Sequence, residues 1–360
     1  MLMHIGVHKT GTTAVQDALA NCRPILSQWQ VRYPGSHQAH RDVASSAMGV
    51  KLGFRTDGVR PPKPGLWEKF AENAANYDGV TVFSSEFLAQ SPTDVARRIV
   101  GTVAPGHLHV AITLRNLGRI LPSAWQQNLK SGYETGYADW LVRVLTMSPE
   151  EGRTTTFWSR HRHDIVVERW AEIVGPDHVS VVVVDDADRR AIYSHFEDLL
   201  ALPRDTLFDR RVAANRSMTL AEAELLRRIN TTLGGARGWR AYSHHAHDGL
   251  IKGIVESREP APDEVRLQTP QWALDIAADK ANEMIDRVEA SGVRILGDTG
   301  VLRARQSGPD VVVNDPVDAV PLDAAVSAIL GGLKSGRSDA PRESAGSSAK
   351  RSLLARVKRS

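Results

Sequence analysis

Residues 2–19 read LMHIGVHKTGTTAVQDAL, and this stretch sets the interpretation of the whole chain. A short apolar run over residues 2–7 stops at a segment rich in Gly and Thr, residues 8–13. Apolar residues then recur at the spacing of one helix face, at Ala14, Val15, Ala18 and Leu19. This order predicts a strand, a loop and a helix.

The same order of strand and helix recurs along the chain. Residues 80–83 are β-branched and aromatic, and a helix is predicted from near Pro92, with Ser91 as its N-cap. Residues 108–114 precede a helix predicted over residues 119–130. Further helices are predicted over residues 137–146, 161–174, 219–230 and 275–290, and strands over the valine-rich residues 179–184 and over residues 293–296. The alternation predicts an α/β fold, with a central, mainly parallel sheet flanked by helices in three layers and ligands at the carboxyl ends of the strands.

Domain organisation follows from composition and charge. We predict one domain over residues 1–305, an appended element over residues 306–333 and a basic tail over residues 334–360. The 360-residue chain has a formal net charge of +3, and the tail alone holds eight Lys or Arg against two Asp or Glu. The rest is slightly acidic as a whole, which does not favour a nucleic-acid-binding body. The tail composition predicts disorder, with weak contact to a membrane surface as the alternative.

Cysteine usage and hydropathy narrow the class of protein. Cys22 is the single cysteine, which excludes an intramolecular disulfide and a Cys-based metal cluster. The sequence contains no apolar run of about 18 residues and no secretion signal, so we expect a cytoplasmic protein without a transmembrane segment. His244, His245 and His247 are interpreted as a polar loop, and no metal ligand is predicted.

The loop after the first strand has the parts of an anion cradle. Backbone N–H groups and the helix dipole point toward an anion at this position. Gly11 permits close backbone approach, Thr12 and Thr13 offer hydroxyl donors, and Lys9 adds a compact positive charge. Lys9 precedes Gly11 by two positions, so the standard P-loop order, in which Lys follows the last Gly, is absent. A simple turn with Thr12 as N-cap is the alternative interpretation.

A family resemblance rests on this loop and on a second motif. His8-Lys9-Thr10-Gly11-Thr12-Thr13 resembles the 5′-phosphosulfate loop of sulfotransferases that use 3′-phosphoadenylyl sulfate (PAPS). In that family an Arg at a strand end and a Ser eight positions later grip the 3′-phosphate of the donor, and Arg115 and Ser123 have this spacing. Lesser points of resemblance are Ser84-Ser85-Glu86, Asn215-Arg216-Ser217 and residues 292–298. The later Arg-Lys-Gly loop of the cytosolic members has no clear match, and residues 235–239 are a weak substitute.

The resemblance implies a P-loop NTPase-like fold over residues 1–305 and a PAPS-dependent sulfotransferase that needs no metal. It implies a hydroxyl acceptor on a carbohydrate, a glycolipid or a small metabolite. Lys9 would stabilise the leaving 5′-phosphate, and Glu86 is the first candidate for the general base, with His8 as the second. The residues expected to bind PAPS are Lys9, Thr10, Gly11, Thr12, Thr13, Arg115 and Ser123.

Two other function classes stay open at this stage. A P-loop-like kinase is disfavoured because the Gly-Lys-Ser/Thr order is absent, and because the strand over residues 108–114 leads into Arg115 where a Mg²⁺-holding Asp would help. A non-catalytic nucleotide-binding or interaction protein would keep the cleft and work through its basic tail. The identity of the acceptor and the oligomeric state are not predicted.

Overall fold

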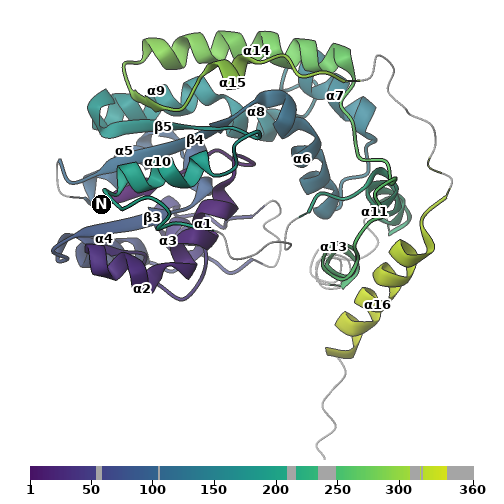
Figure 1. The fold of residues 1–360 in the computed structure, drawn as a ribbon, viewed down its shortest axis with the longest axis horizontal. Helices are drawn as coiled ribbons and strands as arrows, with labels where there is room; N and C mark the ends of the chain where they lie inside the picture. The colour runs from purple at the N-terminus through teal and green to yellow at the C-terminus, as the bar shows by residue number, and fades with distance from the viewer. Residues whose placement is uncertain are drawn as a thin grey trace, which may run out of the picture.

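A computed structural model describes residues 1–53, 59–103, 106–208, 216–233, 249–308, 317 and 319–338 of the chain. In this part of the chain a parallel sheet of six strands has the order β2-β3-β1-β4-β5-β6 (Figure 1). The strands are β1 (Leu2–His4), β2 (Val31–Arg32), β3 (Val80–Ser84), β4 (His109–Arg115), β5 (Val179–Val184) and β6 (Arg294–Leu296). The predicted α/β class with its parallel sheet is confirmed.

Helices cover both faces of this sheet (Figure 1). One face packs against α1 (Thr12–Asn21), α2 (Arg23–Leu26) and α10 (Ala191–Leu199). The other face packs against α3 (Arg41–Met48), α4 (Leu66–Ala75), α5 (Thr93–Gly101), α9 (His163–Val174) and α15 (Gly300–Arg303). The structure therefore has the three predicted layers.

The strands alternate between these two apolar layers. Leu2, Val82, Ala111 and Val182 point toward α1 and α10, whereas Met3, Phe83, Ile112 and Val181 point toward the opposite layer. Because side chains of successive strand residues face opposite sides and both sides are buried, most positions of the strands are apolar. This burial on both faces explains the continuous runs of Val, Ile and Leu in the sequence.

A second apolar core lies beside the sheet and is helical. Its helices are α6 (Leu117–Lys130), α7 (Tyr137–Thr146), α8 (Thr155–His161), α11 (Leu220–Leu233), α13 (Lys252–Ser257) and α14 (Gln271–Ala290). Helix α6 follows β4 directly and continues through Pro122, as predicted. It therefore connects the sheet to the helical core.

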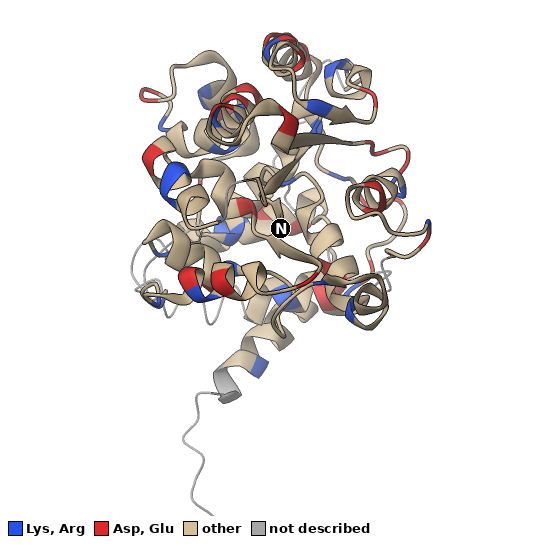
Figure 2. Cartoon of the chain, turned by 90° about the vertical axis from the view of Figure 1, so that its left-hand side faces the viewer, with Lys and Arg blue, Asp and Glu red and all other residues tan. Residues whose placement is uncertain are grey.

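The predicted appended element is a helix, α16 (Leu322–Ser338), which packs against α13. It extends five residues past the predicted end of the element, into the stretch predicted as tail; residues 311–313 and 339–360 lie outside the described residues. Small residues face α13, and large apolar residues on the other side are exposed: Leu322, Val326, Ile329, Leu330 and Leu333. Charged residues of both signs are spread over the other helices, with few on α16 (Figure 2). No helix in the described ranges is long and apolar enough to cross a membrane.

Strand order brings the functional loops to one place. β1 lies between β3 and β4, and all three are parallel, so their carboxyl ends meet at one edge of the sheet. After β1 the chain continues to β2 and β3, which lie on one lateral side of β1, whereas β4 lies on its other side. The strand order therefore reverses direction at β1, and such folds form a crevice at this switch point. The residues that follow these three strands begin with Ile5, Ser85 and Asn116.

One local prediction is wrong. Ser91 is not the N-cap of α5, because Pro92 occupies that position and makes no side-chain capping bond. The Ser91 Oγ atom is buried and has no hydrogen-bond partner among the described residues. Proline favours the turn before a helix because its φ is fixed near the required value, which outweighs the serine cap here.

Buried histidines make the stability of this fold dependent on pH. Burial lowers the pKa of His4 to about 3, and of His40 and His163 to about 4. In the unfolded chain these groups take up protons below about pH 6.5, whereas the folded protein keeps them neutral. As the pH falls from about 6 to about 4, each histidine should therefore lower the free energy of unfolding by about 1.4 kcal/mol per pH unit. Urea unfolding at stepped pH values measures this slope.

His163→Gln should reduce the slope of the free energy of unfolding against pH by the share of one proton, about 1.4 kcal/mol per pH unit. His37→Gln, at an exposed site, should leave this slope unchanged. A slope that is the same in both variants would contradict the role of the buried imidazole.

Candidate functional site

The loop between β1 and α1 has an unusual backbone. Lys9 has φ 68°, in the left-handed region, and Gly11 has φ 79°. Gly11, not Thr12, is the N-cap of α1, and it has no side chain with which to cap the helix. The alternative interpretation, with Thr12 as N-cap, is therefore wrong, and the first-turn amides of Thr12 and Thr13 have no partner within the helix. An anion at this position would accept their hydrogen bonds.

A buried network of hydroxyl and imidazole groups connects the loop to the sheet on which it lies. Thr10 Oγ1 donates to the Val7 carbonyl at 2.6 Å and lies 2.6 Å from Thr113 Oγ1 on β4. His4 on β1 is 2.9 Å from Ser84 Oγ on β3 through Nδ1 and 3.4 Å from Thr113 Oγ1 through Nε2. The side chain of Thr10 therefore faces the core, and only its main chain is left for the ligand role expected of it.

Most of the predicted site residues line one cavity of about 390 Å³ at the carboxyl end of the sheet. From the sequence-based set it contains His8, Lys9, Gly11, Thr12, Thr13, Glu86, Arg115 and Ser123. The remaining lining residues are Gln126, Gln127, Lys130, Arg216 and Ser217. The ends of β1, β3 and β4 thus contribute to a single crevice, which we call the loop cavity.

Lys9 is the charged centre of the loop cavity. Its Nζ atom donates to Gln127 Oε1 on α6 at 2.9 Å. Burial, followed by the charge of Lys130, lowers the pKa of Lys9 to about 8, while the charge of Glu86 opposes this shift. A bound anion would reverse this penalty because it stabilises the charged ammonium.

Arg115 has a partner that the sequence analysis did not identify. Its Nε donates to Asp186 Oδ2 at 3.0 Å, its Nη2 pairs with Asp186 Oδ1, and its Nη1 donates to the Lys9 carbonyl at 3.4 Å. Asp186 lies two residues beyond Val184, which is the register partner of Arg115 across β4 and β5. The carboxylate holds the guanidinium against the loop, so an anion must share Arg115 with Asp186.

One face of α6 forms the wall opposite the loop. Ser123, Gln126, Gln127 and Lys130 recur at helical spacing and all line the loop cavity. Burial lowers the pKa of Lys130, and its ammonium has no ion-pair partner among the described residues. This pattern of polar residues three and four apart was present in the sequence and could have identified Gln127 and Lys130 as site residues.

The two candidate bases occupy different positions. Glu86 begins the short 3-10 helix η2 (Glu86–Gln90) after β3, and its Oε2 accepts from Gln16 Nε2 at 3.2 Å. His8 is buried, with its ring 5.1 Å from the ring of Phe87. Burial, followed by the charges of Arg160 and Lys9, holds the pKa of His8 well below its usual value. The imidazole is therefore neutral near pH 7, and its lowered pKa makes it a weaker proton acceptor than an ordinary histidine.

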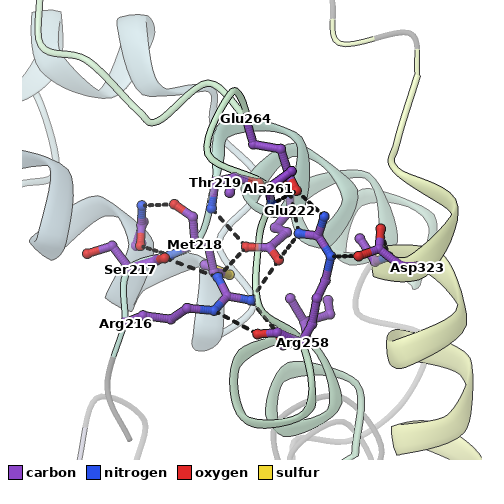
Figure 3. A network of polar contacts seen from close by, with 12 residues as sticks. Arg216, Ser217, Met218, Thr219, Glu222, Arg258, Ala261, Glu264 and Asp323 are labelled. Carbon is purple, nitrogen blue, oxygen red and sulfur yellow. Dashed lines mark hydrogen bonds and ion pairs between the residues drawn. The ribbon is translucent and has the colours of Figure 1, made fainter. Parts of the chain in front are cut away.

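Arg216 reaches the loop cavity from a buried network (Figure 3). Glu222 on α11 accepts from both terminal nitrogens of Arg216, at 2.7 and 2.8 Å, and from Arg258 Nη1 at 2.6 Å. Arg258 also pairs with Glu264 and with Asp323 on α16. Burial raises the pKa of Glu222, but the bonds from Arg216, the Thr219 amide and Arg258 more than offset it and lower the pKa overall. The network fixes Arg216 and connects α16 to the cavity wall.

A second cavity of about 320 Å³ adjoins the first. It shares His8, Lys9 and Gln127 with the loop cavity. Its other lining residues are Ala124, Asn128, Ser131, Gly132, Tyr133, Trp140, Arg153, Thr154, Thr156, Phe157, Arg160 and His161. Glu86 lines only the loop cavity, so His8 is the one candidate base that borders both spaces. We call this second space the α8 cavity.

Some expectations fall on residues that the structure does not describe. Asn215, residues 235–239, and the histidines His244, His245 and His247 lie outside the described residues. Within the described ranges, no three His, Cys, Asp or Glu side chains are grouped so as to hold a metal ion.

Comparison with known proteins gives one distant likeness. No protein-family model and no curated protein matches the sequence. The chain is similar in structure to a sulfotransferase from Alicyclobacillus acidocaldarius, with 16% sequence identity and a TM-score of 0.43. The likeness covers 66% of this chain and 98% of that one.

The lowered pKa of Lys9 makes anion binding dependent on pH. With a pKa of about 8, Lys9 loses its charge as the pH rises through 8, and the loop cavity loses a cation. The affinity for adenosine 3′,5′-bisphosphate should therefore fall about tenfold between pH 7 and pH 9.5, a range in which the phosphates are fully ionised. Calorimetric titration at stepped pH values measures the change.

Lys9→Met should bind weakly at every pH and show a flatter profile, while Lys69→Met, at an exposed lysine on α4, should keep the wild-type profile. An unchanged affinity up to pH 9.5 in the wild type would contradict a role for Lys9 in anion binding.

Proposed function

We propose that this protein is a PAPS-dependent sulfotransferase that transfers a sulfuryl group to a hydroxyl acceptor. The observation that carries the proposal is the single crevice shared by the loop after β1, Glu86 after β3 and Arg115 at the end of β4. A donor with phosphates on the 3′ and 5′ positions of one ribose needs two anion sites facing one space. The loop cavity supports this because it is lined by two cations from different segments, Lys9 in the loop after β1 and Arg115 at the end of β4.

The residues of the loop cavity fit the donor. The first-turn amides of α1 and the Thr13 hydroxyl would hold the 5′-phosphate, and Lys9 would neutralise the charge that grows on it. The Thr12 hydroxyl, which donates to the Val7 carbonyl at 3.4 Å, would have to turn to join them. Arg115 and Ser123 would contact the 3′-phosphate, with the half-buried cation Lys130 beside them. These groups are positioned before the ligand arrives, which lowers the reorganisation cost of the reaction.

Transfer breaks the sulfur–oxygen bond to the 5′-phosphate and forms a sulfur–oxygen bond to the acceptor. The acceptor hydroxyl loses its proton to a base of the chain, and the products are a sulfate ester and adenosine 3′,5′-bisphosphate. By analogy with phosphoryl transfer the geometry is in-line, so the chain contributes by positioning and charge stabilisation. Glu86 is the first candidate for the base, and His8 is the second because it also borders the α8 cavity.

The central test is binding of adenosine 3′,5′-bisphosphate with and without Mg²⁺. We expect saturable binding that Mg²⁺ does not strengthen, and Arg115→Ala should weaken it by about 2 kcal/mol, or about thirtyfold in Kd. Arg119→Ala, at an exposed arginine of α6, is the matched control and should bind as the wild type does. Isothermal calorimetry gives both affinities.

Equal affinities in Arg115→Ala and Arg119→Ala would remove Arg115 from the donor site. Mg²⁺-dependent binding of ATP in preference to the bisphosphate would favour a kinase. Binding of the bisphosphate without sulfuryl transfer to any acceptor would favour a non-catalytic nucleotide-binding protein.

The general base is tested by a substitution that keeps the shape of the side chain. Glu86→Gln should bind adenosine 3′,5′-bisphosphate with an affinity close to that of the wild type, because Glu86 is an acid in a cavity of cations and contributes no attraction to the donor. Its turnover should fall by about 10² to 10⁴, the usual range for the loss of a general base. Single-turnover transfer from radiolabelled PAPS measures the rate. Full activity in Glu86→Gln would move the base role to His8.

A further inference from the structure

The α8 cavity carries charge of one sign. Its ionisable lining residues are His8, Lys9, Tyr133, Arg153, Arg160 and His161, and no Asp or Glu belongs to the described lining. Arg153 is exposed at this cavity, and its guanidinium has no ion-pair partner among the described residues. Arg160 is 8% exposed, and its Nε donates to Gln90 Oε1 at 3.1 Å. A cavity with two guanidinium groups and no carboxylate attracts an anion.

Two buried polar atoms at this cavity lack hydrogen bonds. Thr154 Oγ1 and His161 Nδ1 have no partner among the described residues, and the two residues are 4% and 2% exposed. A buried polar group without a partner is destabilising, and such groups are rare in folded proteins. Both residues border the α8 cavity, so their unused hydrogen-bonding capacity lies beside it.

An aromatic wall gives the cavity a fixed shape. The ring of Trp140 on α7 meets the ring of Phe157 on α8 edge to face at 5.5 Å, and Phe157 is 4.6 Å from the ring of His161. Tyr133 is half-buried at the same cavity. Interlocked rings of this kind do not collapse into an empty space, and they favour a ligand with a flat, partly apolar body.

We propose that the α8 cavity binds the acceptor and that the acceptor is a hydroxylated ring compound carrying a carboxylate. The carboxylate lies against Arg153 and Arg160 with the Thr154 hydroxyl, and the reacting hydroxyl extends past His8 and Lys9 into the loop cavity, where Glu86 lies. A planar carboxylate matches the fork of a guanidinium, and a ring fits the aromatic wall. This inference rests on the proposed function for the identity of the bound compound as an acceptor.

Binding of matched compounds tests the inference on the full chain, with and without saturating adenosine 3′,5′-bisphosphate. One pair is 4-hydroxybenzoate and 4-hydroxybenzyl alcohol, and the other is methyl β-glucuronide and methyl β-glucoside. In at least one pair the carboxylate should bind about tenfold more tightly than its neutral partner. The preferred pair distinguishes an aryl acid from a sugar acid.

Arg153→Gln should remove this preference, lowering the affinity for the carboxylate about tenfold and that for the neutral compound less than twofold. Arg189→Gln, at an exposed arginine that lines neither cavity, is the matched control and should keep the preference. Thr154→Val, which removes one hydroxyl from a buried site, should weaken carboxylate binding by a smaller factor.

Equal binding of both members in both pairs would overturn the inference, and so would an undiminished preference in Arg153→Gln. The proposed function is tested separately, since it fails when the bisphosphate itself does not bind. The carboxylate could bind in a way that depends on Arg153 while the bisphosphate does not bind at all. This result would support an anion site in the α8 cavity and reject its role as an acceptor site. Carboxylate binding together with bisphosphate binding, followed by sulfate ester formation on the preferred compound, supports both.

Discussion

The 2.6 Å contact between the hydroxyls of Thr10 and Thr113 is the interaction on which the site depends. It ties the loop after β1 to β4 and leaves Lys9 in the left-handed region above the sheet. Left-handed backbone at a non-glycine residue is costly and persists only where surrounding contacts impose it. The buried hydrogen bonds of Thr10 to Val7 and Thr113 impose this backbone conformation here, because breaking them would leave polar groups without partners in the core. The direction of the α1 amides follows from this anchored turn.

Sheet topology and electrostatics then act together. Parallel strands bring cations from β1, β4, α6 and the segment before α11 to one edge, where they repel one another and are partly desolvated. Polar partners hold most of them in place: Gln127 for Lys9, Asp186 for Arg115 and Glu222 for Arg216. The electrostatic potential in the cleft is therefore positive, and the repulsion between its cations is unfavourable. A bound polyanion would reduce this repulsion. This is how a protein of nearly neutral charge can present a strongly basic pocket.

The sequence was sufficient for the fold class because the decisive signals are local. Residues 179–184 are a strand and residues 137–146 a helix at the predicted bounds, since apolar runs and helical periodicity report burial directly. β2 escaped prediction because two residues carry no periodicity, and α8 because its seven residues have weak patterning. The grouping of the loop with Glu86 and Arg115 followed from the rule for strand ends. The roles assigned to these residues stay predictions.

Other parts of the site could not be predicted because they depend on contacts between distant segments. Asp186 is an ordinary turn carboxylate in the sequence and becomes a partner of Arg115 only through the register of β4 and β5. The inward rotation of Thr10 is likewise set by β4. Residues of α6, α7 and α8 line the α8 cavity together, and none of these residues stands out in the sequence by itself. In contrast, the polar spacing on α6 was visible and was missed.

A crystal structure with adenosine 3′,5′-bisphosphate would locate both phosphates of one ligand in the loop cavity. We expect the 5′-phosphate within hydrogen-bond distance of the Thr12 and Thr13 amides and the 3′-phosphate in contact with Arg115. A bisphosphate bound with its 3′-phosphate away from Arg115, or bound outside the loop cavity, would contradict this expectation.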